Sequence, residues 1–115
     1  MYILIWMSHA LAASWTVGPT GADYATIQEA IDNASTGDTI AVASGTYSEG
    51  LDLSGLDLTI TATSGSASTF LKPPSKSTAV QWIQSEGGSL DGFTIEPDDA
   101  RAFEVKGGHP VIKNC

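Results

Sequence analysis

The sequence predicts an all-β fold, a right-handed single-stranded parallel β-helix of about three coils with a short N-terminal capping α-helix. Three observations lead to this prediction. Short segments that alternate apolar and polar residues are separated by turns rich in Gly, Ser and Asp, which indicates many short strands. A partial repeat recurs at a spacing of 22 or 23 residues, and one amphipathic helix precedes it.

Composition and charge limit the function classes. The 115 residues are enough for one domain, and 42% apolar with 16% charged residues is typical of a globular chain. The formal net charge is −8, and the first basic residue is Lys72. No cluster of Lys and Arg is present to neutralise phosphates, so we expect no nucleic-acid partner. The same acidity repels acidic polysaccharides unless a cation bridges the two surfaces.

The first fourteen residues differ from the rest. Tyr2–Met7 is almost wholly apolar, and Ala10–Ser14 has the small residues that suit signal-peptidase cleavage. We therefore expect a signal peptide over residues 1–14, a β-helix domain over 15–115 and a secreted, extracellular or cell-surface location. No Lys or Arg precedes the apolar run, which is also too short for a membrane span. A buried first strand, or a true start other than Met1, is the alternative.

The helix is expected over Thr26–Ala34. Thr26 and Glu29 have the spacing of a capping box, in which both side chains satisfy free backbone N–H groups. Apolar residues recur at helical spacing on one face, namely Ile27, Ala30, Ile31 and Ala34. Gly37 is expected to end the helix in the left-handed conformation. A helix this short depends on packing against an apolar surface.

Strands are expected wherever apolar residues alternate. The expected segments are 15–17, 39–43, the runs through Leu51 and Leu53 and through Leu56, Leu58 and Ile60, then 79–83, 90–95, 102–105 and a last one beginning within 110–115. Ser44–Tyr47 is expected to be a turn. Lys72–Lys76 is expected to be a loop because its two prolines remove backbone donors.

The repeat pairs distant strands. Ala79–Trp82 resembles Ala102–Val105, and Leu90–Phe93 aligns with Ile112–Cys115. One repeat of this length has the size of one β-helix coil. A single coil cannot bury its apolar face alone, so neighbouring coils must stack. The stacking predicts three inward ladders: Val80 over Phe103, Trp82 over Val105 and Phe93 over Cys115. A small β-sandwich, whose strands recur at similar intervals, remains the alternative.

Three motifs resemble the start of pectin-lyase-like right-handed β-helix proteins, with a pectinesterase-like beginning. They are Ala22–Asp32 (ADYATIQEAID), Gly37–Val42 (GDTIAV) and Gly45–Glu49 (GTYSE). Leu58–Ile60 and Gly92–Ile95 also look like coil strands of that superfamily, so the resemblance spans about 15–115. It implies that the helix caps the open end of the first coil. It also implies structural roles for Tyr47 and Glu49, with Glu49 bonded to backbone near the first turn.

No catalytic, cofactor-binding or metal-binding residue is recognised in the sequence. Asp98, Asp99 and Arg101 could bind Ca²⁺ or pair with one another, but a solvated turn is the preferred interpretation. His9 and His109 are too far apart to predict a metal site. The other residues considered are Trp82, expected in the core rather than stacked on a sugar, Cys115, which has no cysteine partner, and Asn33–Ser35, a glycosylation sequon.

Two functions are compatible with this pattern. The first is an extracellular β-helix protein that binds polysaccharide or acts as a surface scaffold, without a catalytic site in this segment. The alternative is the N-terminal part of a carbohydrate-active enzyme (a polysaccharide lyase, a pectinesterase-like esterase or a glycoside hydrolase) whose site lies beyond residue 115. Because Cys115 falls in mid-repeat, we expect a fragment whose partners include the remaining coils of its parent chain. No cofactor and no membrane span are expected.

Overall fold

The computed structural model describes residues 13–53, 55–83, 87–97, 102–106 and 110–115. That part of the chain contains one helix and a series of short strands. In chain order they are β1 (Ser14–Val17), α2 (Ile27–Asn33), β2 (Thr39–Val42), β3 (Gly45–Tyr47), β4 (Leu51–Asp52), β5 (Thr59–Ala62), β6 (Thr69–Leu71), β7 (Val80–Ile83), β8 (Ser89–Asp91), β9 (Thr94–Ile95), β10 (Phe103–Lys106) and β11 (Val111–Lys113).

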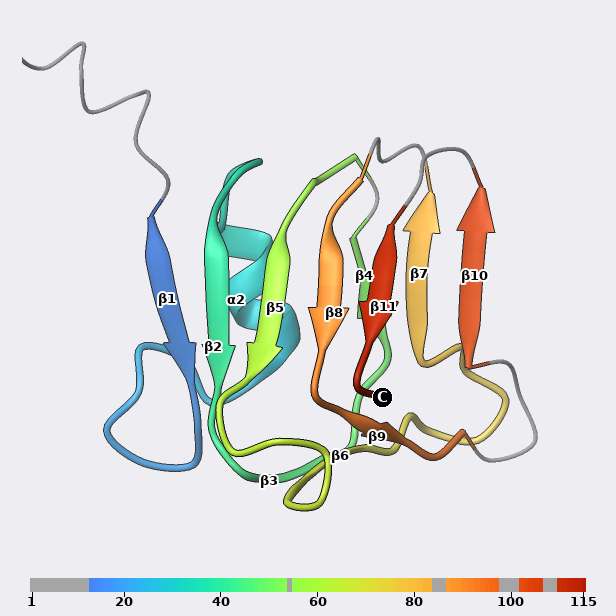
Figure 1. Cartoon of the computed structure of the whole chain (residues 1–115). Helices are drawn as coiled ribbons and strands as arrows, with labels where there is room; N and C mark the ends of the chain where they lie inside the picture. The colour runs from blue at the N-terminus through green and yellow to red at the C-terminus, as the bar shows by residue number, and fades with distance from the viewer. Residues whose placement is uncertain (1–12, 54, 84–86, 98–101, 107–109) are drawn as a thin grey trace, which may run out of the picture.

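The strands form a parallel β-solenoid of about four turns. Three sheets run along it, in the strand orders β1-β2-β5-β8-β11, β10-β7-β4 and β3-β6-β9. The strands of the first sheet point one way and β7 and β10 point the other way (Figure 1). Every pairing between these strands is parallel, which confirms the predicted β-helix and excludes an antiparallel β-sandwich for the described residues.

The solenoid has more turns than the three expected. The coil from Ile60 to its partner Leu90 is longer than the coil from Leu90 to Ile112, because it carries the loop with two prolines. The first coil, from Trp15 to Ile40, contains the helix. The coil from Trp15 to Ile40 and the coil from Ile60 to Leu90 do not have the 22-residue spacing, so the repeat in the sequence did not reveal them.

Stacked inward residues form the core. Ile40, Ile60 and Leu90 occupy equivalent positions on β2, β5 and β8, and all are fully buried. The predicted ladders of Val80 with Phe103 and of Trp82 with Val105 are confirmed by the pairing of β7 with β10. The third ladder, Phe93 over Cys115, is not formed by strand pairing. Strand β11 ends at Lys113, and Cys115 is exposed whereas Phe93 is buried.

Two predicted strand boundaries were wrong. The segment expected as one strand over 90–95 forms β8 and β9, separated by Gly92 at a φ of 84°. A Cβ on Gly92 would lie 3.2 Å from the carbonyl oxygen of Ala62, so the chain bends where the neighbouring coil approaches closely. The turn expected at Ser44–Tyr47 contains β3, because Tyr47 pairs with Leu71 of the next coil. Both errors concern solenoid corners: the chain bends at Gly92 within the expected strand, and pairing with β6 forms a strand within the expected turn.

Helix α2 closes one end of the solenoid behind β2 and β5 (Figure 1). It packs against β1, β2 and β4 through Ile27, Ala30 and Ile31, which are buried. Thr26 is the N-cap and accepts the Glu29 N–H at 3.2 Å, as predicted from the capping box. The helix ends at Asn33 rather than at the expected glycine, since Ala34 is already extended. Gly37, at a φ of 97°, lies in the following turn.

Residues 1–12 lie outside the described part of the chain, so the predicted signal peptide stays a prediction. Ser14, the last residue of that predicted segment, is the first residue of β1. In the described residues, no helix is long and apolar enough to cross a membrane.

Candidate functional site

The outward side of the β4–β7–β10 sheet presents a row of polar side chains. The register places Asp52 beside Gln81 and Gln81 beside Glu104. Alternation along each strand turns Leu51 and Val80 inward, so their neighbours face outward. Strands in a sheet are about 4.8 Å apart, and the row therefore repeats regularly along the solenoid.

The helix extends this row beyond the sheet. Asp52 N donates to Gln28 Oε1 at 2.8 Å, and Gln28 Nε2 donates to the Asp52 carbonyl at 3.3 Å. The same Gln28 amide donates to Asp32 Oδ1 at 3.0 Å. These bonds fix the helix to β4, so the cap and the sheet form one continuous polar surface.

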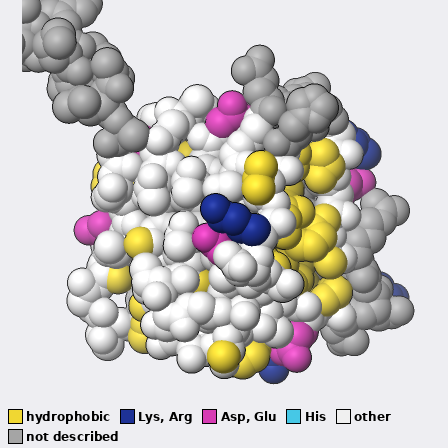
Figure 2. All heavy atoms as spheres, in the orientation of Figure 1, with side chains coloured by type: hydrophobic (Ala, Val, Ile, Leu, Met, Phe, Trp, Pro, Cys, Tyr) yellow, Lys and Arg dark blue, Asp and Glu magenta, His cyan; other side chains and the backbone are white. Residues whose placement is uncertain are grey.

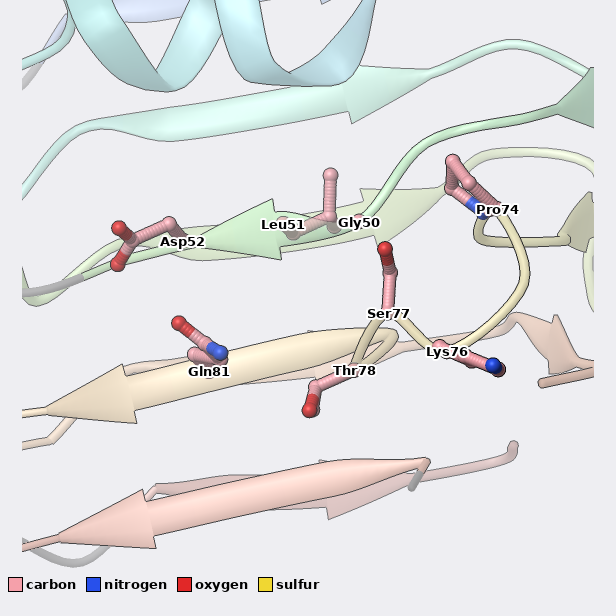
Figure 3. Close-up of a pocket in the computed structure, with 8 residues that line it drawn as sticks. All are labelled: Gly50, Leu51, Asp52, Pro74, Lys76, Ser77, Thr78 and Gln81. Carbon is pink, nitrogen blue, oxygen red and sulfur yellow. The ribbon is translucent and has the colours of Figure 1, made fainter. Parts of the chain in front are cut away.

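Two open hollows meet on this surface at Asp52. The larger, of about 430 Å³, is lined by Gly50, Leu51, Asp52, Pro74, Lys76, Ser77, Thr78 and Gln81 (Figure 3). In that view the Ser77 side chain points toward β4, whereas Lys76 points away from it. The second hollow, of about 400 Å³, lies beside α2 and is lined by Gln28, Ile31, Asp32, Ala34, Asp52 and Leu56.

The loop before β7 shapes the larger hollow. Ser77 N donates to the Pro74 carbonyl at 3.0 Å, and Lys76 has a φ of 67°, which non-glycine residues rarely adopt. A Cβ on Gly50 would lie 2.7 Å from the carbonyl oxygen of Thr78. A glycine is therefore required there for β4 to approach the loop.

The chemistry of this surface suits a ligand rich in hydroxyl groups. Asp52 offers carboxylate acceptors, Gln81 offers an amide donor and acceptor, and Ser77 and Thr78 offer hydroxyl groups. Lys76 supplies a positive charge at the rim. Such groups can make several hydrogen bonds to a sugar polymer at once. Among the described residues, they form no arrangement that is specific to one reaction.

Glu49 and Tyr47 have the structural roles that the sequence led us to expect. The Glu49 carboxylate accepts the N–H groups of Ile27 and Gln28 at 2.9 and 2.8 Å, which satisfies two free donors of the helix. The Tyr47 hydroxyl donates to the Ala43 carbonyl at 2.7 Å. Burial, and secondarily the negative charge of Glu49, raises the pKa of Tyr47.

Asp38 is a buried carboxylate that sequence reasoning did not single out. It is 5% exposed and accepts hydrogen bonds from Ser35 N at 2.9 Å, Ala13 N at 2.9 Å and Trp15 Nε1 at 3.0 Å. The backbone N–H groups of Ser35 and Ala13, helped by Trp15, lower the pKa of Asp38 against the opposing effect of burial. Asp38 lies in the Gly37–Val42 motif, and that motif indicated a structural role rather than a chemical one.

The other residues considered from the sequence do not join the polar row. Trp82 is fully buried, as expected, and stacks on Phe103 with ring centroids 6.3 Å apart, so it cannot contact a surface sugar. Asn33 Nδ2 donates to the Glu29 carbonyl at 2.8 Å. Asp98, Asp99, Arg101, His9 and His109 lie outside the described residues. Within the described ranges, no group of three or more His, Cys, Asp or Glu side chains could hold a metal ion.

No protein-family model, curated protein or solved structure matches this chain. The β-solenoid therefore rests on the strand pairing described above.

Proposed function

We propose that this chain belongs to an extracellular, pectin-lyase-like β-helix protein that binds polysaccharide on the outer β4–β7–β10 face and serves as a surface scaffold. The observation that carries the proposal is the polar row of Asp52, Gln81 and Glu104, bordered by two hollows that meet at Asp52. The regular spacing of neighbouring strands suits a polymer whose hydroxyl groups also repeat regularly.

The charge of the chain selects among polysaccharides. Asp52 and Glu104 are acidic, Lys76 stands at the rim, and the net charge is −8. A uronic-acid polymer would be repelled by this field, whereas a neutral glycan loses nothing by approaching it. The proposed ligand is therefore a neutral polysaccharide.

Retention on glycans coupled to beads tests the proposal. The protein is mixed with cellulose, xylan and mannan, and with polygalacturonate in the presence and absence of Ca²⁺, and the bound fraction is measured. We expect retention on at least one neutral glycan and none on polygalacturonate without Ca²⁺. Gln81→Ala removes a donor and an acceptor from the row and should weaken binding about threefold to tenfold.

A matched control separates the surface from general stickiness. Thr59→Ala changes an exposed residue on β5, in another sheet, and should leave binding unchanged. The proposal would be contradicted if the protein bound none of the neutral glycans, or if both variants lost binding equally. Release of new reducing ends or of unsaturated sugars from a glycan would favour the enzymatic alternative.

A further inference from the structure

The buried carboxylate of Asp38 is surrounded by neutral donors. Its Oδ2 accepts from Ser35 N and Trp15 Nε1, and its Oδ1 accepts from Ala13 N at 2.9 Å. None of the ion pairs formed between described residues involves Asp38. A buried charge that has no counter-charge is costly even where hydrogen bonds surround it, so a cation at this position would stabilise the fold.

Basic side chains are absent from the part of the sequence around Asp38. The first Lys or Arg of the chain is Lys72, which follows β6. On the face shown in Figure 2, the Lys and Arg side chains of the described residues lie toward β8, β9 and β10, and none lies over β1. Apart from His9, which is outside the described residues, an α-amino group is the one cation that the first coil can supply.

Ala13 directly follows small residues that have the spacing of a signal-peptidase site. Ala10 and Ala12 occupy the two alanine positions of the A-x-A pattern, and an apolar run precedes them. Ala12 and Ser14 have a similar spacing, which would correspond to a cut two residues later. The structure distinguishes the two bonds, because the Ala13 carbonyl accepts Thr39 N at 2.9 Å and Ser14 is the first residue of β1. A cut after Ser14 would remove both residues from the sheet.

We infer that the Ala12–Ala13 peptide bond is a processing site and that Asp38 receives the N-terminus created by the cut. A signal peptidase adds water across this bond: the hydroxyl joins the Ala12 carbonyl carbon, the C–N bond breaks, and the other proton goes to Ala13 N. Near neutral pH the new carboxyl group loses a proton and the new amine gains one. Ala13 N already lies 2.9 Å from Asp38 Oδ1, so a neutral donor becomes a cation in the same place.

The new ion pair would fix the processed N-terminus to two elements at once. The Asp38 carboxylate also holds Trp15 on β1 and Ser35 after α2, so the edge strand and the cap share one anchor. The inference rests on the extracellular location in the proposed function and does not depend on glycan binding.

The N-terminus of the secreted protein tests the processing site. The full 115-residue reading frame is expressed in a secreting host, and the exported protein is analysed by intact mass and N-terminal sequencing. We expect a chain that begins at Ala13. Ala12→Leu enlarges the side chain beside the cut and should abolish this product, whereas Ser14→Leu changes an exposed residue and should leave it. A start at Trp15, an uncut chain, or an equal effect of both variants would overturn the assignment.

Labelling of the new α-amino group tests its pairing with Asp38. An acylating reagent at pH 7 modifies only uncharged amines, and the ordinary pKa of an α-amine is about 8. A carboxylate partner raises that pKa, and each pKa unit lowers the uncharged fraction about tenfold. The Ala13 amine should therefore react about tenfold more slowly than it does in Asp38→Asn. Asp23→Asn removes an exposed carboxylate that accepts Thr16 N instead, and should leave the rate unchanged.

A measurement on the unaltered protein keeps the test decisive if Asp38→Asn fails to fold. The pH at which Ala13 labelling reaches half its maximal rate should be higher in the native protein than in urea, whereas burial alone would lower it. An equal or lower midpoint, or an equal effect of the two asparagine variants, would overturn the pairing. Cleavage at Ala13 without glycan retention would contradict the proposed glycan binding alone, and glycan retention with cleavage elsewhere would contradict this inference alone.

Discussion

Asp38 shows how a single buried charge can organise the start of this fold. Its carboxylate accepts hydrogen bonds from Ala13 just before β1, from Trp15 on β1 and from Ser35 after α2. It therefore joins three segments of the chain. A buried carboxylate is costly unless donors surround it, and here backbone and indole N–H groups do so. The residue therefore ties the edge strand to the cap.

The protonation of Asp38 should affect stability in acid. Its folded pKa lies below the ordinary 3.8, so its contribution is complete above that value and is lost as pH falls through the lowered folded pKa. Asp38→Asn should cost about 1–3 kcal/mol at pH 7, since one acceptor becomes a donor. Urea unfolding at pH 7 and pH 3 measures this, and the gap between the two proteins should narrow at the lower pH. A gap that widens in acid would contradict the assignment.

Gly50 lies where β4 closely approaches the loop before β7. Gly50→Ala should destabilise the protein by about 1–3 kcal/mol, because the new methyl group would press on the Thr78 carbonyl. Gly87→Ala is the control: no atom lies within 4 Å of the added Cβ, and the change should stay within about 0.5 kcal/mol. Thermal melts of both variants make the comparison, and equal melting temperatures would argue against the close approach.

The register of β5 depends on which residues face inward. Leu58 and Ile60 are fully buried, whereas Asp57 is partly exposed and its Oδ1 accepts Gly87 N at 2.8 Å. Leu58→Asp buries an unpaired charge and should cost roughly 3 kcal/mol or more. Asp57→Asn keeps an oxygen acceptor and should change stability by less than about 1 kcal/mol. If denaturant unfolding shows the two variants to be equally stable, the register is wrong.

At the scale of elements, helix α2 depends on a carboxylate from a different coil. Glu49→Ala leaves the N–H groups of Ile27 and Gln28 without their acceptor and should cost about 1–2 kcal/mol. Glu49→Gln, which keeps one acceptor oxygen, should lose less. Hydrogen exchange at the two amides reads the effect directly. Unchanged exchange in Glu49→Ala would show that the carboxylate does not hold the helix.

Local signals made some elements predictable and left others hidden. Helix α2 was predictable because Thr26, Glu29 and the apolar face lie within a few residues of one another. Strand β3 was not, because Gly45 and Thr46 favour a turn and the strand forms through pairing with β6. The candidate surface was also hidden, since Asp52 and Gln81 come together through coil register and no local motif marks them. Pairings between coils of unequal length cannot be read from one sequence.

At the scale of the whole molecule, the described strands form a stack of coils, with α2 packed at the end that holds β1. The loop before α2 and the helix itself close the N-terminal end, whereas β10 and β11 leave apolar ladders and an edge exposed. Between the ends, stability is a sum over neighbouring coils, each of which buries the face of the next.

Backbone contacts between β5 and β8 test the central claim most directly. Solution NMR should show cross-strand nuclear Overhauser effects that link Ile60 with Leu90 and Thr61 with Asp91, in the same order along both strands. That parallel order, across a long sequence separation, is what a β-solenoid requires. Contacts that run in opposite order along the two strands, or their absence in a folded protein, would contradict the solenoid and restore the β-sandwich alternative.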